Sequence, residues 1–208
     1  MTDISTAEAR MRRITSLCLN CKRCPLYAGR TNVVVGEGNV DADIMLIGEA
    51  PGANEDASGR PFVGEAGRML DRALESAGIS RDDVFIANVM KCRPPKNRTP
   101  TKTEAAACSE YLFEQIRIVR PKVLVTMGNS ATTWAMPMVR SVTSVRGQLW
   151  RCESIHEHKT DTILNKSELL VYPTFHPAAA LYDNGKVDPL LKDFERLTAW
   201  LAENPDFD

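Results

Sequence analysis

The segment "DIMLIGEAPGANEDASGRPFVGEAG" at residues 43–67 joins a short apolar run to a loop rich in glycine and carboxylates. Its first part, 43–48, is almost continuously apolar, which is typical of a strand buried on both faces of a parallel sheet. The same pattern recurs in "VFIANV" (84–89), "KVLVTMG" (122–128) and "LLVYPTF" (169–175). The sequence therefore predicts four parallel strands.

Helical patterns fill the gaps between these runs, at 65–78, 101–119, 129–138 and 187–204. Thr101 and Glu104 form a capping-box pattern at the start of one helix, and Gly78 is expected to end another. Because strands and helices alternate, the fold class is α/β. We expect a three-layer αβα sandwich with a central four-stranded parallel sheet.

The chain has 208 residues, an apolar content of 43% and a formal net charge of −1. This length suits a single domain over residues 1–208, with residues 1–40 wrapping onto its core. The overall charge does not indicate a nucleic-acid binder, so that function would depend on local charge. Residues 1–17 lack the apolar stretch of a secretory signal, and no run approaches the roughly 20 apolar residues of a membrane span. We therefore expect a cytoplasmic protein with reduced thiols.

Polar residues follow each predicted strand, where open α/β sheets bind their ligands. They are Glu49 and the glycine-rich loop after the first strand, Asn88 at the end of the second, 128–130 after the third and His176 after the fourth. We expect them to converge on one pocket. The alternative for His176 is a core histidine, while His156 and His158 lie in a polar stretch and are expected to be solvated.

The glycine-rich loop has neither the Gly-Lys-Ser/Thr ending of a P-loop nor the glycine spacing of a dinucleotide fingerprint. Glycines let a backbone approach a flat ligand closely, and Phe62 offers a stacking face. Glu49 and Glu55 offer acceptor oxygens. The loop therefore suits a flat, polar, neutral ligand such as a nucleobase, and the alternative is a solvated surface loop.

Six cysteines, at 18, 21, 24, 92, 108 and 152, indicate a metal or catalytic site rather than disulfides in a reducing compartment. The first three form two overlapping Cys-x-x-Cys pairs, and a second, distant pair could complete a four-thiolate site. Spacing alone leaves zinc and an iron–sulfur cluster open. Cys108 could instead be a small core residue, and Cys18 and Cys152 are expected to be plain thiols.

Several motifs in order resemble the family 4 uracil-DNA glycosylases, which carry a 4Fe–4S cluster. They are "CKRCPLYAGR" (21–30), "GEAPGANEDASGRPFVGEAG" (48–67), "NVMKCRPPKNRTPT" (88–101), "VLVTMGNSA" (123–131), "SVRGQ" (144–148) and "TFHPAAAL" (174–181). The resemblance implies that the cluster ligands are Cys21, Cys24, Cys92 and Cys108, two of them supplied by residues 1–40. It also implies that the cluster is structural. Ala178 departs from the serine found in many members.

The resemblance also implies roles for the residues at the predicted strand ends. Phe62 stacks on an extruded uracil, Asn88 reads its edge, and Gly48 and Ala50 complete the substrate site. The catalytic residues are Glu49, which orients water or stabilises the sugar cation, His176, which donates to the leaving base, and Glu55, placed against uracil C5 to obstruct a thymine methyl. The segment 91–102 has five basic and no acidic residues and follows Asn88, so we expect it to contact the DNA backbone, although a solvated face is the alternative. The expected contacts are Lys91, Arg93, Lys96, Arg98 and Arg146.

The partner implied is uracil-containing DNA, single- or double-stranded, bound by a monomer that starts base excision repair. Three alternatives remain. One is a catalytically silent iron–sulfur DNA-binding module. The second is a relative that traps uracil-DNA covalently, although that class has Gln in the first motif and a basic insertion ending in His. The third is a zinc-binding nucleotide hydrolase.

Overall fold

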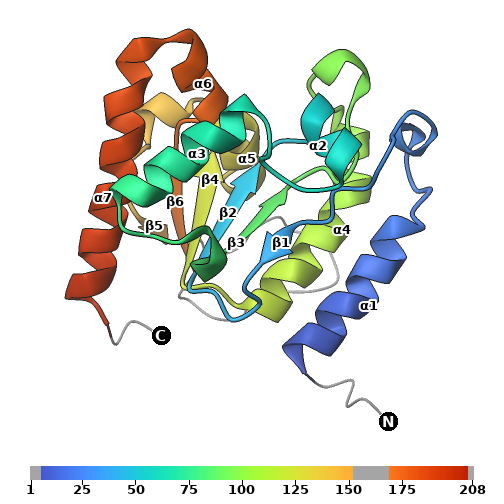
Figure 1. Ribbon diagram of the computed structural model, residues 1–208, viewed down its shortest axis with the longest axis horizontal. Helices are drawn as coiled ribbons and strands as arrows, with labels where there is room; N and C mark the ends of the chain where they lie inside the picture. Colours follow the sequence, from blue (N-terminus) through green and yellow to red (C-terminus); the bar gives the residue numbers. More distant parts are fainter. Residues whose placement is uncertain (1–5, 152–168, 206–208) are drawn as a thin grey trace.

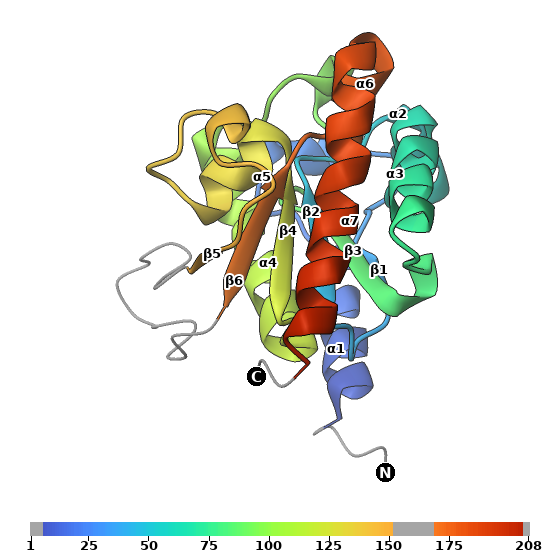
Figure 2. The same ribbon diagram turned by 90° about the vertical axis from the view of Figure 1, so that its left-hand side faces the viewer.

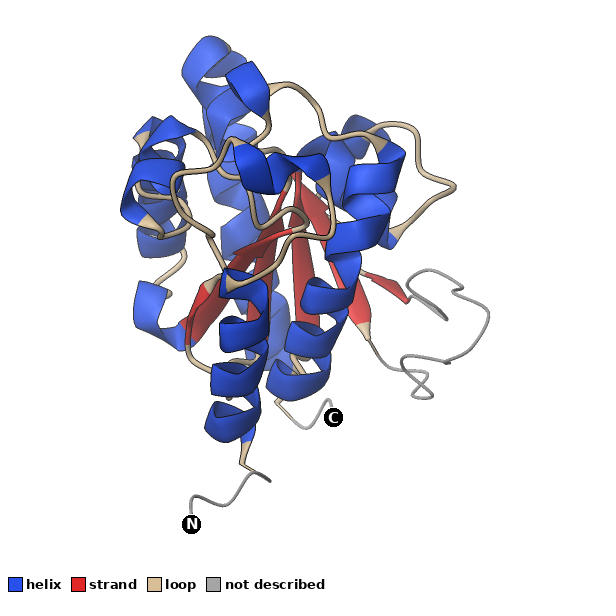
Figure 3. Ribbon diagram, turned by 90° about the vertical axis from the view of Figure 1, so that its right-hand side faces the viewer, coloured by secondary structure: helices blue, strands red, loops and turns tan. Residues whose placement is uncertain are grey.

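The computed structural model describes residues 6–151 and 169–205. His156, His158 and Cys152 lie outside the described residues. Within them, one six-stranded sheet has the order β1-β3-β2-β4-β6-β5. Helices cover both of its faces (Figure 1, Figure 3). The predicted α/β class is confirmed.

Four of these strands are the predicted ones: β2 (Ile44–Gly48), β3 (Val84–Asn88), β4 (Val123–Met127) and β6 (Leu170–Thr174). Each is buried along its whole length, and neighbouring strands among them pair in parallel. The sheet is mixed, however, because β1 (Glu37–Gly38) and β5 (Trp150–Arg151) pair antiparallel at its two edges. The sequence did not predict these edge strands, since two residues are too few to show a period.

Alternate residues of each strand point to opposite faces, and this alternation builds two cores. Met45 and Ile47 of β2 pack under α1 (Ala7–Leu19), α4 (Lys102–Val119) and α5 (Gly128–Ala135). Ile44 and Leu46 pack under α3 (Glu65–Ser76), α6 (Pro177–Tyr182) and α7 (Val187–Glu203). Figure 2 shows α7 crossing one face of the sheet with α4 behind it.

The helix boundaries follow local signals in the sequence. Thr101 and Glu104 form the expected capping box of α4. The helix α3 ends two residues before Gly78, which has a φ of +70°. The helices α1, α2 (Ala53–Ser58) and α6 were not predicted. The shorter turns are 3-10 helices at Pro25–Ala28, Arg81–Asp83, Pro95–Asn97, Val142–Ser144 and Asn184–Lys186.

No helix in the described ranges is long and apolar enough to cross a membrane. The helix α1 packs against α4, so the beginning of the described chain contacts the sandwich.

Candidate active site and cysteine cavity

A pocket of about 530 Å³ lies beyond the carboxyl ends of the parallel strands. Its lining includes Glu49 after β2, Asn88 at the end of β3 and His176 after β6. Glu55 and Phe62 of the glycine-rich loop line it too. The structure thus brings together the residues selected after three of the four strands. Asn129 and Ser130, which follow β4, line a second cavity instead.

Asn88 enters this pocket because its neighbour on the adjacent strand has no side chain. The register of β2 and β3 places Gly48 opposite Asn88. A Cβ on Gly48 would lie 2.3 Å from Asn88 Oδ1 and 2.7 Å from the Phe62 ring. Asn88 is buried, and its Oδ1 has no hydrogen-bond partner among the described residues. An unpaired buried acceptor is costly, so this atom indicates a ligand with an N–H or O–H donor.

Phe62 is held in an unusual backbone conformation, with a φ of +51°. Arg81 donates to the carbonyls of Pro61 (2.6 Å) and Phe62 (3.2 Å). Gly67 packs so closely that a Cβ there would lie 1.9 Å from the Phe62 carbonyl oxygen. A left-handed phenylalanine is rare and persists only where its surroundings enforce it, so the loop is built to place this ring.

His176 forms the N-cap of α6, and its Nδ1 accepts the backbone N–H of Ala178 at 3.1 Å. Burial lowers its pKa to about 4, against the opposing effect of the Glu55 carboxylate. The imidazole is therefore neutral at pH 7, and because Nδ1 is an acceptor, the proton is on Nε2. Its ring centroid lies 5.6 Å from that of Phe62.

The carboxylate of Glu49 accepts a hydrogen bond from the hydroxyl of Ser130, in the first turn of α5. The Glu49 carbonyl accepts the N–H of Met90 at 3.0 Å. Glu49 also lines a second cavity of about 580 Å³, bounded by residues of α4 and α5. Its carboxylate therefore has a fixed orientation at the boundary between two cavities.

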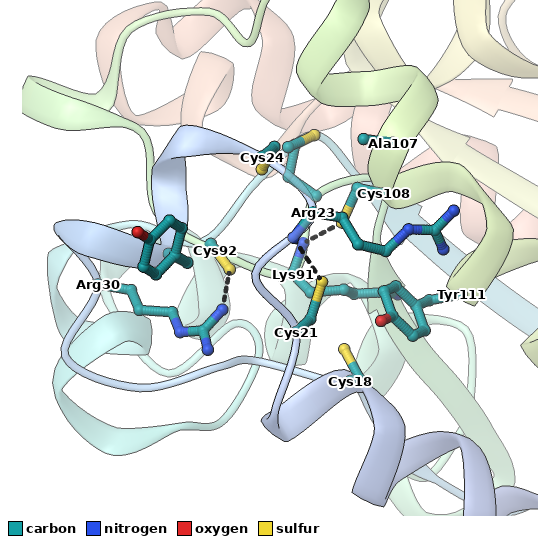
Figure 4. Close-up of a pocket in the computed structure, with 12 residues that line it drawn as sticks. Cys18, Cys21, Arg23, Cys24, Arg30, Lys91, Cys92, Ala107, Cys108 and Tyr111 are labelled. Atoms are coloured by element: carbon teal, nitrogen blue, oxygen red, sulfur yellow. Dashed lines mark hydrogen bonds between the residues drawn. The ribbon is translucent and has the colours of Figure 1, made fainter.

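Five cysteines line a separate cavity, together with Met90 and Lys91 of the loop that follows β3 (Figure 4). All are free thiols, and they are Cys18, Cys21, Cys24, Cys92 and Cys108. Three of the sulfurs accept N–H groups: Cys108 from the Lys91 backbone (3.2 Å), Cys92 from Arg30 (3.2 Å) and Cys21 from the Arg23 backbone (3.5 Å). In the part of the chain that the structure describes, no three ligating side chains are close enough to hold a single metal ion.

The model of the uracil DNA glycosylase superfamily matches residues 35–202. The chain is 44% identical over 192 residues to the type-4 uracil-DNA glycosylase of Sulfurisphaera tokodaii, covering 90% of this chain and 83% of the relative. It is 42% identical over 201 residues to that of Thermotoga maritima, covering 95% and 98%. A type-5 uracil-DNA glycosylase of Pyrobaculum aerophilum is 30% identical over 200 residues, covering 81% and 83%.

This chain belongs to the type-4 uracil-DNA glycosylase family. The expected resemblance to family 4 is thereby confirmed.

Among the residues that the family motifs single out, Glu55 lies differently from expectation. Its Oε1 accepts the N–H groups of Val63 and Gly64, each at 3.0 Å, and its Oε2 accepts that of Gly52 at 3.1 Å. Both oxygens therefore hold the two ends of the glycine-rich loop together. These bonds indicate a positioning role for Glu55 in the loop, and its expected catalytic role stays a prediction.

Two of the expected DNA contacts, Lys91 and Arg146, are bonded to other protein groups. Lys91 is buried, and its ammonium donates to the Asn88 carbonyl and to Gln115. Arg146 pairs with the buried Asp193 (2.6 Å), donates to the Pro189 carbonyl and lies over the Phe175 ring. Both cations therefore have protein acceptors in this structure.

The remaining basic residues of the loop lie near the pocket. Lys96 and Arg98 are exposed, and Arg98 lines the pocket. Arg98 forms an ion pair with Glu104 on α4 at 2.7 Å. This pair, together with hydrogen bonds from Thr101, lowers the pKa of Glu104 to about 2. Arg93 donates to Asn97 Oδ1 at 2.7 Å.

The sequence selected Ser130 only as part of the segment 128–130 and assigned no role to it. Its position after the third strand was the available signal, but its contact with Glu49 depends on how β2 and α5 pack. Ala50 and Ala178 line the pocket, as expected for neighbours of Glu49 and His176.

Proposed function

We propose that this chain is a uracil-DNA glycosylase, which extrudes uracil from DNA and hydrolyses its N-glycosidic bond to initiate base excision repair. One observation carries the proposal beyond family membership. The unpartnered Asn88 Oδ1 lies in a pocket beside a stacking ring and a neutral histidine. A glycosidic bond is not accessible within a duplex, so a pocket for an extruded base is what this chemistry requires.

Uracil fits the hydrogen-bonding capacity of Asn88. The Asn88 carboxamide offers one acceptor and two donors. Uracil N3–H would donate to Oδ1, and uracil O4 would accept from Nδ2. Cytosine presents an unprotonated N3 and an amino group, which reverses both partners and leaves mispaired buried groups at a cost of roughly 1–3 kcal/mol each. Phe62 would stack on the base, since its ring lies close to Gly48 and lines the same pocket as Asn88.

The bond between sugar C1′ and uracil N1 breaks with its electron pair leaving on the base. His176 would donate its Nε2 proton as a hydrogen bond to uracil O2, where this charge develops. Glu49 would act on the sugar side, by orienting the water whose oxygen adds to C1′ and by stabilising the positive charge on the sugar. Ser130 supports this role because it fixes the Glu49 carboxylate.

Arg93, Lys96 and Arg98 are the basic residues that we propose as contacts to the DNA backbone. They follow Asn88 in the chain, and Arg98 lines the pocket. Phosphate contacts of this kind supply affinity without reading sequence. We further propose that the chain acts as a cytoplasmic monomer with a single domain, which size-exclusion chromatography with light scattering would test for the oligomeric state.

We propose Cys21, Cys24, Cys92 and Cys108 as ligands of a 4Fe–4S cluster. Free thiols from two distant parts of the chain line one cavity, and N–H donors face three of the sulfurs. Cysteine thiolates are the usual ligands of such a cluster, so these four residues would hold it. The bound cluster would supply no step of the hydrolysis and would cross-link residues 21–24 to the loop after β3 and to α4.

An excision assay on matched oligonucleotides tests the function. We expect uracil release from substrates with uracil in a single strand, opposite guanine or opposite adenine, and none from the same oligonucleotides with cytosine. Binding without release would indicate the catalytically silent module. A protein–DNA adduct that survives denaturing electrophoresis would indicate the covalent trapping relative, and zinc in place of iron in the purified protein would support the nucleotide hydrolase.

A further inference from the structure

The Lys91 side chain is buried, with 1% of its surface exposed, whereas Lys96 and Arg98 in the same basic segment are exposed. Its ammonium donates to the Asn88 carbonyl at 2.9 Å and to Gln115 Oε1 at 2.6 Å. Burying a cation is costly unless specific partners replace water. The fold therefore supplies these two acceptors to the Lys91 ammonium in place of water.

Neither acceptor of Lys91 is charged. The ionisable groups that face its ammonium are the thiols of Cys18 and Cys108. The backbone N–H of Lys91 donates to the Cys108 sulfur at 3.2 Å. Lys91 thus lies between the cysteine cavity and the end of β3 (Figure 4).

The backbone between Asn88 and Lys91 forms a tight turn that Lys91 closes. The N–H groups of Val89 and Met90 donate to the Gly48 and Glu49 carbonyls, each at 3.0 Å. The Lys91 ammonium then reaches back to the carbonyl of Asn88. The bond from the Lys91 ammonium thus acts directly on the backbone that carries the Asn88 side chain.

The Asn88 carboxamide itself is not held through its oxygen, because Oδ1 has no partner among the described residues. Its orientation before a ligand arrives therefore depends on the backbone that carries it. Lys91 fixes that backbone through its hydrogen bond to the Asn88 carbonyl. Lys91 is held in turn by Gln115, whose Nε2 donates to the Val35 carbonyl at 2.9 Å.

We propose that Lys91 is a positioning residue for base recognition. Its hydrogen bond to the Asn88 carbonyl fixes the backbone and thereby the carboxamide that reads the base. This inference rests on the proposed function. Lys91 precedes one proposed cluster ligand, Cys92, and donates to another, Cys108. The inference gives it a role in specificity rather than in DNA binding. The same contacts connect the cysteine cavity to the base pocket through one side chain.

Lys91→Met tests the inference, because methionine fills a similar volume and removes the donor. The measurements are binding of free uracil by calorimetry, single-turnover excision, and iron content per folded chain. We expect folded, iron-containing protein in which uracil affinity and the rate of chemistry fall about 10- to 100-fold, the range for one hydrogen bond to a charged group. Discrimination against cytosine should fall as well, while the KM for DNA changes little. Lys192→Met, an exposed lysine on α7, is the matched control.

A purely structural role would lower the folded fraction or the iron content and leave uracil affinity per folded molecule unchanged, and that result would overturn the inference. If Lys91→Met does not fold, Gln115→Met serves as the test. It removes one acceptor of the Lys91 ammonium and leaves the bond from that ammonium to the Asn88 carbonyl. We expect a smaller loss of uracil affinity in this variant, and unchanged affinity would overturn the inference. A wild-type protein that neither binds nor releases uracil would instead refute the proposed function.

Discussion

The hydroxyl of Ser130 donates a hydrogen bond to the Glu49 carboxylate, which connects the loop after β2 to the first turn of α5. Ser130→Ala should therefore leave Glu49 in place but free to rotate. We expect single-turnover excision to slow about 10-fold, as for one hydrogen bond to a charged group, with DNA affinity unchanged. Ser76→Ala is the control, because that hydroxyl bonds only the backbone of α3. Equal rates in both variants would show that Glu49 needs no support from Ser130.

His176 gives a prediction about pH. Burial holds its pKa at about 4, so the neutral donor is present throughout the range from pH 5 to 8. The excision rate should show no acid limb with the midpoint of an ordinary histidine. An acid limb near pH 6.5 that disappears in His176→Ala would contradict the neutral assignment.

The same pKa shift affects stability with a defined sign. Between pH 4 and 6.5 the unfolded chain binds a proton that folded His176 does not, so the contribution of His176 to stability is lost as the pH falls through this window. Urea unfolding at several pH values, compared with His176→Ala, measures this loss. We also expect His176→Ala to slow excision by roughly 100-fold, as for removal of an oxyanion donor.

Asn88→Asp changes the edge that faces the base. An ionised carboxylate matches neither pyrimidine, and a protonated one matches cytosine, so we expect a large loss of uracil excision and a weak gain on cytosine. Oligonucleotides with a single uracil or cytosine measure both rates. Asn39→Asp is the control, since Asn39 is exposed at a turn outside the pocket. Unchanged kinetics on uracil would remove Asn88 from the base pocket.

The cysteine cavity gives a prediction about iron. Cys92→Ala should lose iron, visible absorbance and thermal stability, because it removes a proposed ligand. Cys18→Ala is the closest control in the molecule, since Cys18 is buried and lines the same cavity. We expect Cys18→Ala to retain its iron. Iron loss in Cys18→Ala but not in Cys21→Ala would exchange the roles of these two cysteines.

Arg146 and Asp193 give a prediction about stability. Asp193 is fully buried, and burial raises its pKa although Thr174 and Arg146 both favour the charged form. Arg146→Met removes the cation that hydrogen-bonds this carboxylate and leaves only Arg196 nearby, so the free energy of unfolding should fall by about 3–5 kcal/mol. Arg68→Met, which breaks an exposed ion pair with Glu65, should change it by less than about 1 kcal/mol. A weaker salt dependence of DNA binding in Arg146→Met, at unchanged stability, would restore Arg146 as a phosphate contact.

The sequence was sufficient to predict the four parallel strands, because each is a continuous apolar run that both faces of the sheet bury. Glu49, Asn88 and His176 could be placed in one pocket for the same reason, since each follows a strand and parallel strands end together. The edge strands β1 and β5 could not be predicted, because a two-residue pairing depends only on what lies beside it.

Three features of the site that the sequence did not show share a physical cause. Lys91 lies in a basic segment that looks solvated, and its burial depends on Gln115, which belongs to another element. Glu55 is bound by N–H groups that face it only after the glycine-rich loop has closed. The left-handed backbone of Phe62 likewise depends on Arg81 and Gly67, which are not adjacent to it in sequence. Local patterns report local preferences, and these side chains are placed by partners that no local pattern contains.

The lack of space at Gly48 limits how this pocket can evolve. Any side chain at this position would overlap the carboxamide of Asn88 and the ring of Phe62, so a first mutation there would damage the base site before a second could adapt it. A lineage that acquired a different base preference would have to change at position 88 or in the loop around 62, while position 48 stayed glycine. Laboratory libraries meant to alter base preference should vary those positions and leave Gly48 fixed.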